Sequence, residues 1–325
     1  MSAGAGGRRA VNVDWKEADR LNTFRYGLAT AGGIEIPENL LATAPSGLPA
    51  WRALAPDLPT EARIASARIS AVIGISSSAD LVDLYAALMD EADSYTGADS
   101  PAGRLRTAYV AGDMDDRMTA LGPSWDGDAG DQHYAAQIAT ARPAARIVPN
   151  SSFAADAGGL IGAMLSAGLD RQALRWWPVV ADRNETGDLA WARLAAGAPG
   201  PSEPVSSGRL VDWAGSLPGG VKSHRAGLAL AALAGLGRIN AETGQDLAGK
   251  FGTSLTGNNR WLTRLDRAAA AGRKGEVALL AAVGMQTTSW AGVPPAHLYR
   301  IVAALKQVGL EAEARMIAAE AIARS

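Results

Sequence analysis

The sequence lacks several residue types on which protein chemistry often depends. It contains no cysteine in 325 residues, which excludes disulfides, thiolate catalysis and cysteine-ligated zinc. Only three histidines are present, His133, His224 and His297. They lie far apart in the sequence, and none belongs to an H-E-x-x-H zinc motif. These absences remove the commonest routes to a catalytic or metal-binding site.

An excess of charge of one sign is also missing. The chain has 31 basic and 33 acidic residues, a net charge of −2, and no basic stripe of the kind that binds nucleic acid. The longest uncharged stretch, residues 277–299, is interrupted by polar residues and by two prolines. It therefore predicts helices joined by a loop and not a membrane span. Hydrophobic residues make up 48% of the chain, enough to expect a substantial core and not a disordered chain.

The N-terminal residues give little information about location. Residues 1–10 contain glycine and arginine but no apolar segment, so they do not resemble a secretory signal. We expect residues 1–14 to be a flexible tail. The compartment stays open: a soluble cytoplasmic protein is the default expectation, and a periplasmic one is the alternative if the chain has been trimmed.

Helical periodicity dominates the rest of the chain. Apolar residues recur at i, i+3, i+4 and i+7 in two clear stretches, which are Leu81, Leu84, Tyr85 and Leu88, and Leu298, Ile301, Val302 and Leu305. This spacing is typical of one face of a helix. Residues 71–75 form the most strand-like run, but they continue the helical period of Ile64 and Ile69, and we predict helix there as well.

Glycines recur between the helical stretches. The candidate turn glycines are Gly112, Gly168, Gly237, Gly272 and Gly309. Two helices joined by a tight glycine turn form a helical hairpin, and repeated hairpins stack into a solenoid. We therefore predict an all-α fold, an array of antiparallel helical hairpins. The proline-rich stretch 198–208 has two possible roles. It either divides the array into two lobes, residues 15–205 and 206–325, or forms a loop within one continuous solenoid.

The spacing of the last three glycines, 35 and 37 residues, is close to the 34-residue period of tetratricopeptide repeats. Gly309, Ala314 and Ala321 resemble the second helix of such a repeat. Gly168 and Ala173 match the first two of these positions, although Val180 occupies the third. The aromatic and glycine positions of the first helix are not matched. The resemblance is to a degenerate tetratricopeptide-like or Sel1-like array, mainly in the C-terminal half, and it implies a superhelix whose concave face binds peptides or partner helices.

Two stretches approach known ligand motifs and then depart from them. Residues 244–251 fit G-x-x-x-x-G-K, but Phe251 replaces the serine or threonine that reaches magnesium. We instead expect a helix that ends near Gly249. Asp126, Asp128 and Asp131 crowd a glycine-rich loop before His133, yet they lack the spacing and the closing glutamate of a calcium loop. We expect a solvated turn there. We therefore predict no catalytic residue, no cofactor and no metal site.

Tryptophan is the one aromatic residue in abundance, with nine copies against three phenylalanines. Trp176 and Trp177 are adjacent in a predicted hairpin, and neighbouring residues on a helix point about 100° apart. One of the two is therefore expected near a surface, where tryptophan often anchors a partner. This pair is the candidate protein-binding site.

We expect a non-catalytic module for protein–protein interaction or scaffolding in a bacterial assembly, with a protein partner. This step from fold to function is an analogy. One alternative is a solenoid associated with a cell-wall enzyme such as a lytic transglycosylase. Another is an α/α-barrel enzyme with acids on loops such as residues 122–131.

Overall fold

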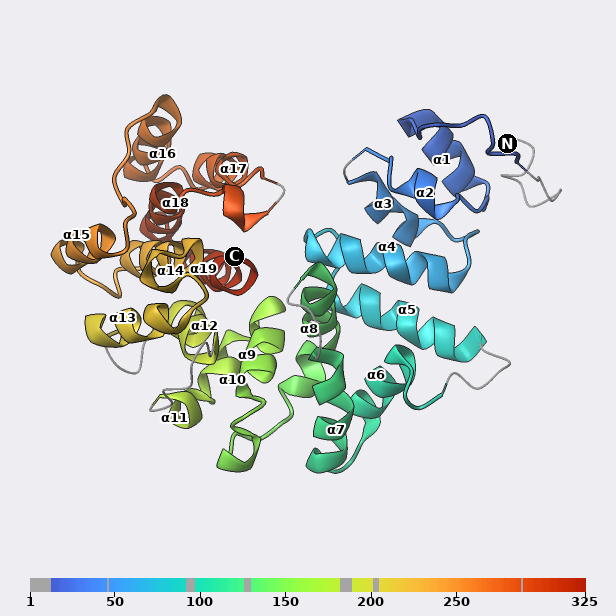
Figure 1. The fold of residues 1–325 in the computed structure, drawn as a ribbon, viewed down its shortest axis with the longest axis horizontal. Coiled ribbons are helices and arrows are strands. Elements are labelled where there is room, and N and C mark those ends of the chain that lie inside the picture. The colour runs from blue at the N-terminus through green and yellow to red at the C-terminus, as the bar shows by residue number, and fades with distance from the viewer. Residues whose placement is uncertain are drawn as a thin grey trace. The chain divides into compact units, whose positions relative to one another are not determined.

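The computed structural model of the chain describes residues 13–45, 47–91, 97–125, 130–181, 189–200, 205–287 and 289–325. Every regular element in these ranges is a helix, so the all-α prediction is confirmed (Figure 1). The chain forms two compact units, residues 1–143 and 144–325. The proline-rich stretch 198–208 falls inside the second unit.

Unit 1 contains short helices followed by longer ones. Its elements are α1 (Thr23–Ala31), α2 (Glu38–Leu41), α3 (Leu48–Trp51), η1 (Arg52–Leu54), α4 (Thr60–Val72), α5 (Ser78–Glu91), α6 (Pro101–Val110), α7 (Met114–Trp125) and α8 (Asp131–Ala144), whose last residue begins unit 2. The helix at α5 was predicted from its periodicity. Ser77 begins it as a cap, because its backbone amide donates to Asp80 Oδ2 and its hydroxyl accepts from the Asp80 amide.

Packing in unit 1 follows the chain order. Helix α4 packs against α3 and α5, α5 against α6, and α6 against α7. Clusters of buried side chains stabilise the described part of the unit. One lies around Tyr26 in α1, and the other brings Leu81, Leu105 and Ile138 together from α5, α6 and α8.

Unit 2 contains the larger core. Its elements are η2 (Ser151–Phe153), α9 (Ala157–Ser166), α10 (Asp170–Leu174), α11 (Trp177–Val180), α12 (Leu189–Gly197), α13 (Ser207–Ser216), η3 (Gly220–Lys222), α14 (His224–Gly235), α15 (Ala241–Lys250), α16 (Arg260–Ala270), α17 (Lys274–Gly284), η4 (Trp290–Gly292), α18 (Pro295–Gln307) and α19 (Glu311–Arg324).

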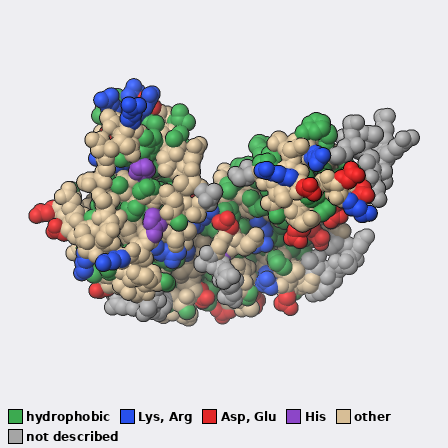
Figure 2. All heavy atoms as spheres, turned by 45° about the horizontal axis from the view of Figure 1, so that its top comes forward, with side chains coloured by type: hydrophobic (Ala, Val, Ile, Leu, Met, Phe, Trp, Pro, Cys, Tyr) green, Lys and Arg blue, Asp and Glu red, His purple; other side chains and the backbone are tan. Residues whose placement is uncertain are grey.

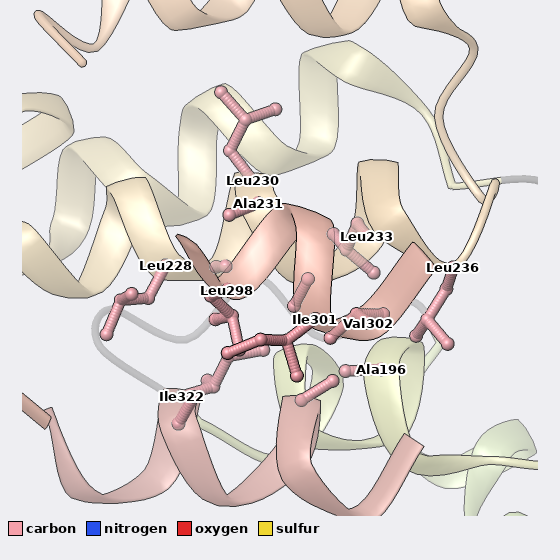
Figure 3. Close-up of a cluster of buried hydrophobic side chains, with 14 of the residues drawn as sticks. Ala196, Leu228, Leu230, Ala231, Leu233, Leu236, Leu298, Ile301, Val302 and Ile322 are labelled. Carbon is pink, nitrogen blue, oxygen red and sulfur yellow. The ribbon is translucent and has the colours of Figure 1, made fainter. Parts of the chain in front are cut away.

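Helix α14 lies at the centre of this core. All residues from Ala226 to Leu233 are buried, because the helix is apolar on every side and must be surrounded by protein. Helices α18 and α19 pack on it with Leu298, Ile301 and Ile322 (Figure 3). Gly235 allows α18 to approach closely, since a Cβ atom there would meet the Tyr299 carbonyl oxygen at 2.8 Å.

The last helix returns to earlier parts of unit 2. Helix α19 packs against its neighbour α18 and also against α14, α12 and α9. In a regular solenoid each repeat contacts only its neighbours. Unit 2 is therefore closed by contacts between elements more than a hundred residues apart, such as Arg315 with Gly197.

Four of the five predicted turn glycines end a helix in a left-handed conformation. Gly168, Gly237, Gly272 and Gly309 have φ between 66° and 81°. At each, the backbone amides of the glycine and of the next residue donate to carbonyls three and five residues earlier, which is the Schellman motif. Gly112 lies between α6 and α7 without a positive φ.

The same motif corrects one expectation. Of residues 71–75, Ala71 and Val72 are helical as predicted, but residues 73–75 are not, because α4 ends at Val72 and Gly74 adopts a φ of 77°. The Ile75 amide donates to the Ser70 carbonyl and completes the Schellman motif.

Candidate functional site

The two tryptophans of the predicted pair differ in burial: Trp176 is buried and Trp177 is half-buried. Trp176 caps the start of α11 and is 1% exposed, so it is a core residue and cannot contact a partner in this conformation. Trp177 is half-buried and packs against the unit 2 core. Of the pair, only Trp177 is left as a candidate partner contact.

The structure describes part of the acidic loop and all of the stretch that fits G-x-x-x-x-G-K. Residues 126–129 of the acidic loop lie outside the described part of the chain. Asp131 and His133 lie in α8, where His133 Nε2 is 3.0 Å from Gln137 Nε2. No group of three potential metal ligands occurs among the described residues. Residues 241–250 form helix α15, with Lys250 in its last turn, so the expected helix end is confirmed.

An apolar cavity lies between α5 and α6 in unit 1. Its volume is about 260 Å³, and its lining includes Val82, Tyr85, Met89, Leu105, Tyr109 and Val110. Asp90 and Arg106 add one charge of each sign. Burial raises the pKa of Tyr85 against a smaller opposing effect of the Arg68 charge, so the phenol is neutral at physiological pH.

Incomplete burial of α5 creates this cavity. Of the residues in α5, all of which are described, only Leu81 is fully buried. The apolar residues on either side of it, including Leu84 and Leu88, are half-buried. The helix has more apolar surface than its two neighbours cover.

Exposed apolar side chains are concentrated in the same unit. Eight of the eleven large hydrophobic residues exposed in the described ranges belong to unit 1: Phe24, Trp51, Leu54, Ile69, Ile73, Ile75, Val110 and Met114. Val110 is 71% exposed and Phe24 is 73% exposed. Hydrophobic side chains are visible at the surface between charged groups (Figure 2). Exposed apolar side chains mark interaction sites where they form a contiguous patch.

Sequence reasoning missed this surface for an identifiable reason. Ile64 of α4 is buried, while Ile69 of the same helix and Ile73, which follows its last residue, are 40% and 51% exposed. The spacing of four between Ile69 and Ile73 marks a second apolar stripe and was a usable signal. Periodicity alone cannot tell which stripe meets the core.

Comparisons of the chain with known protein families, with curated proteins and with solved structures gave no significant match. No helix in the described ranges is long and apolar enough to cross a membrane.

Proposed function

We propose that the chain is a non-catalytic protein–protein interaction module, built from tetratricopeptide-like helical hairpins, and that unit 1 carries its docking surface. The observation that supports this most is the number of exposed apolar side chains in unit 1, one of which, Val110, lines an apolar cavity. The assignment of function from hairpin architecture is an analogy, whereas the exposed surface is a property of this chain.

The exposed side chains give a partner a source of binding free energy. Burial of one Val, Leu, Ile or Phe side chain contributes about 1.5–3 kcal/mol. Val110 lines the cavity and is 71% exposed, so a partner that covers it gains most of that amount at one position. A few such anchors usually dominate the affinity of an interface.

The apolar lining of the cavity, which comes from two helices, favours an amphipathic helix as the docking element. The cavity runs between two helices and is lined mainly by apolar side chains. A helix lays its apolar face into such a groove through anchors at i, i+3, i+4 and i+7. Asp90 and Arg106 can then pair with charges beside those anchors.

The experiment compares three variants of the full chain as bait in an extract of the source cell, with captured proteins identified by mass spectrometry. The variant Val110→Glu places a charge in the cavity, and we expect it to weaken capture of the partner at least tenfold. Leu279→Glu is the matched control, because Leu279 is 65% exposed in unit 2. Trp177→Ala tests the contact predicted from the sequence.

Three outcomes contradict the proposal. Equal capture by the Val110→Glu chain and the unchanged chain would show that unit 1 does not dock the partner. A Val110→Glu chain that is much less stable than the control would show that Val110 is buried within the chain in solution. Recovery of bound cell-wall glycan without any protein partner would favour the enzyme-associated hypothesis instead.

A further inference from the structure

Helix α16 in unit 2 carries a line of exposed arginines. Arg260, Arg264 and Arg267 follow one another at i, i+4 and i+7 and are all exposed, so they lie along one face of the helix. The residues that α16 buries are all apolar and lie on its opposite side. Arg273, which directly precedes α17, is exposed as well. The hairpin of α16 and α17 therefore presents four guanidinium groups to solvent.

The acidic residues of this hairpin are already paired. Glu276 of α17 forms ion pairs with Arg264 at 2.8 Å and with Arg273 at 2.9 Å. Asp266 of α16 pairs with Arg300 of α18 at 3.0 Å. The other two arginines of the line make no ion pair with the described residues. Positive charge therefore remains uncompensated on this side of the hairpin.

Two exposed apolar side chains of α17 adjoin the arginines. Leu279 and Val283 are 65% and 46% exposed. They follow Glu276 by three and seven residues, which puts all three on the side of α17 where Glu276 meets Arg264. From Ala278 to Val283 every residue of α17 is apolar, so no polar group separates the two exposed side chains. Cationic and apolar side chains are therefore neighbours on the outer face of the hairpin.

The two helices that carry this face are firmly joined. They pack mainly against each other and against α18, at the edge of unit 2 (Figure 1). The Trp261 indole Nε1 donates to the Leu280 carbonyl oxygen at 3.0 Å. The same ring lies so close to Gly284 that a Cβ atom there would overlap it. Packed helices hold the outer side chains in place without any contribution from a ligand.

We propose that this outer face, formed by Arg260, Arg264, Arg267, Arg273, Leu279 and Val283, binds the surface of an anionic lipid membrane. Clusters of about four to eight basic residues are attracted to the negative potential of anionic headgroups, and guanidinium groups pair with phosphate oxygens through two hydrogen bonds. Leu279 and Val283 then enter the boundary between headgroups and acyl chains.

The apolar pair favours a membrane over other polyanions. A nucleic acid offers its backbone phosphates to cations and hydrogen-bond donors, and such contacts leave Leu279 and Val283 in water. A lipid surface provides phosphates and an apolar phase side by side, as the outer face does. The membrane-binding face lies in unit 2 and does not depend on the docking surface proposed for unit 1.

The first experiment measures flotation of the full chain with vesicles of phosphatidylcholine alone and of phosphatidylcholine with one third phosphatidylglycerol. We expect binding to the anionic vesicles only, and weaker binding as salt is added. The double variant Arg260→Gln, Arg267→Gln should bind at least fivefold more weakly. Arg171→Gln, Arg175→Gln is the matched control, because it removes the same charge from two exposed arginines elsewhere in unit 2, and it should bind within twofold of the unchanged chain.

The second experiment tests contact of the apolar pair with lipid. The chain has no cysteine, so Leu279→Cys provides a single site for an environment-sensitive fluorophore. Val148→Cys is the control, since Val148 is 50% exposed in the same unit. Addition of anionic vesicles should raise the emission at least twofold and shift it to the blue at position 279, with no change at position 148.

Four results would overturn the proposal. They are equal binding to the two kinds of vesicle, binding to neither, equal losses in the two double variants, and equal fluorescence changes at the two labels. A DNA duplex and polyglutamate are the competing probes at equal ionic strength. Tighter binding of either one than of the anionic vesicles would assign the face to a nucleic acid or to an acidic protein instead. None of these results bears on capture of a protein by unit 1.

Discussion

Arg315 Nη1 donates hydrogen bonds to Asp170 Oδ2 and to the Gly197 carbonyl oxygen, each at 2.7 Å. One buried side chain of the last helix therefore joins the start of α10 to the C-terminal end of α12. The guanidinium places positive charge where the helix dipole of α12 is negative. It also satisfies a carbonyl that the helix leaves without a partner.

The first prediction concerns removal of this connection. Arg315→Ala should lower the free energy of unfolding of unit 2 by about 3–5 kcal/mol, because it leaves the Asp170 carboxylate and the Gly197 carbonyl without their donor. Urea denaturation followed by circular dichroism measures the change. Arg324→Gln is the control, since Arg324 pairs with Glu320 at i, i+4, and such a pair contributes about 0.3–0.5 kcal/mol. Equal effects of the two variants would show that the long-range contact does not close unit 2.

The second prediction concerns the contact between α14 and α18. Gly235→Ala should destabilise the protein by about 1–3 kcal/mol, because the new Cβ meets the Tyr299 carbonyl oxygen at 2.8 Å and Val302 Cβ at 3.0 Å. Helix propensity alone predicts the opposite sign. Gly249→Ala tests that opposite case, since nothing lies within 4 Å of a Cβ atom there, and it should be neutral or stabilise by up to about 1 kcal/mol. Thermal unfolding of both variants distinguishes crowding from propensity.

The third prediction compares a turn glycine that has a positive φ, Gly309, with one that does not, Gly112. Gly309→Ala should cost about 1–2 kcal/mol, because φ is 81° there and an L-residue is strained in that region. Gly112→Ala should change stability by less than about 0.5 kcal/mol, since Gly112 has no positive φ and no atom lies within 4 Å of a Cβ atom. A loss as large at Gly112 as at Gly309 would contradict the assignment of the Schellman turns.

The sequence was sufficient to predict an all-α fold and several of the helix ends. The i, i+3, i+4 spacing of Leu298, Ile301 and Val302 is a local property, and so is the need for glycine where a helix ends with a positive φ. The helix end at Gly74 was missed because the apolar run around it has the same period as α4. The turn consists of apolar residues and glycine, so it lacks the polar residues that usually mark a turn in a sequence.

The contacts between helices that are far apart in the chain could not be predicted from the sequence. Nothing near Arg315 in the sequence points to Gly197, since the contact depends on how α19 packs after both helices have formed. The sequence also could not show which tryptophan of the pair is buried. Adjacent residues on a helix point in different directions, but this does not say which of Trp176 and Trp177 faces the core.

The last prediction concerns the start of α5 and its response to acid. The backbone amide and the hydroxyl of Ser77 donate to Asp80 and hold the pKa of its carboxyl below the usual value. A carboxyl whose pKa is lower in the folded state stabilises the protein above its unfolded pKa of about 3.9, and this contribution is lost as pH falls through the folded value. Asp80→Asn should therefore be less stable than the unchanged chain near pH 7, and the difference should shrink below pH 4.

The measurement is the free energy of unfolding between pH 2.5 and pH 7, with Asp83→Asn as the control on the same helix. Asp83 is exposed, and it lies beyond the cap that Ser77 and Asp80 form. Ser77→Ala should lower stability at neutral pH by about 0.5–2 kcal/mol, because it removes the hydroxyl that caps the Asp80 amide. If the effect of Asp80→Asn is the same at pH 2.5 and at pH 7, the ionised carboxylate does not stabilise the cap. The half-buried helix that lines the cavity would then begin without charge-assisted capping.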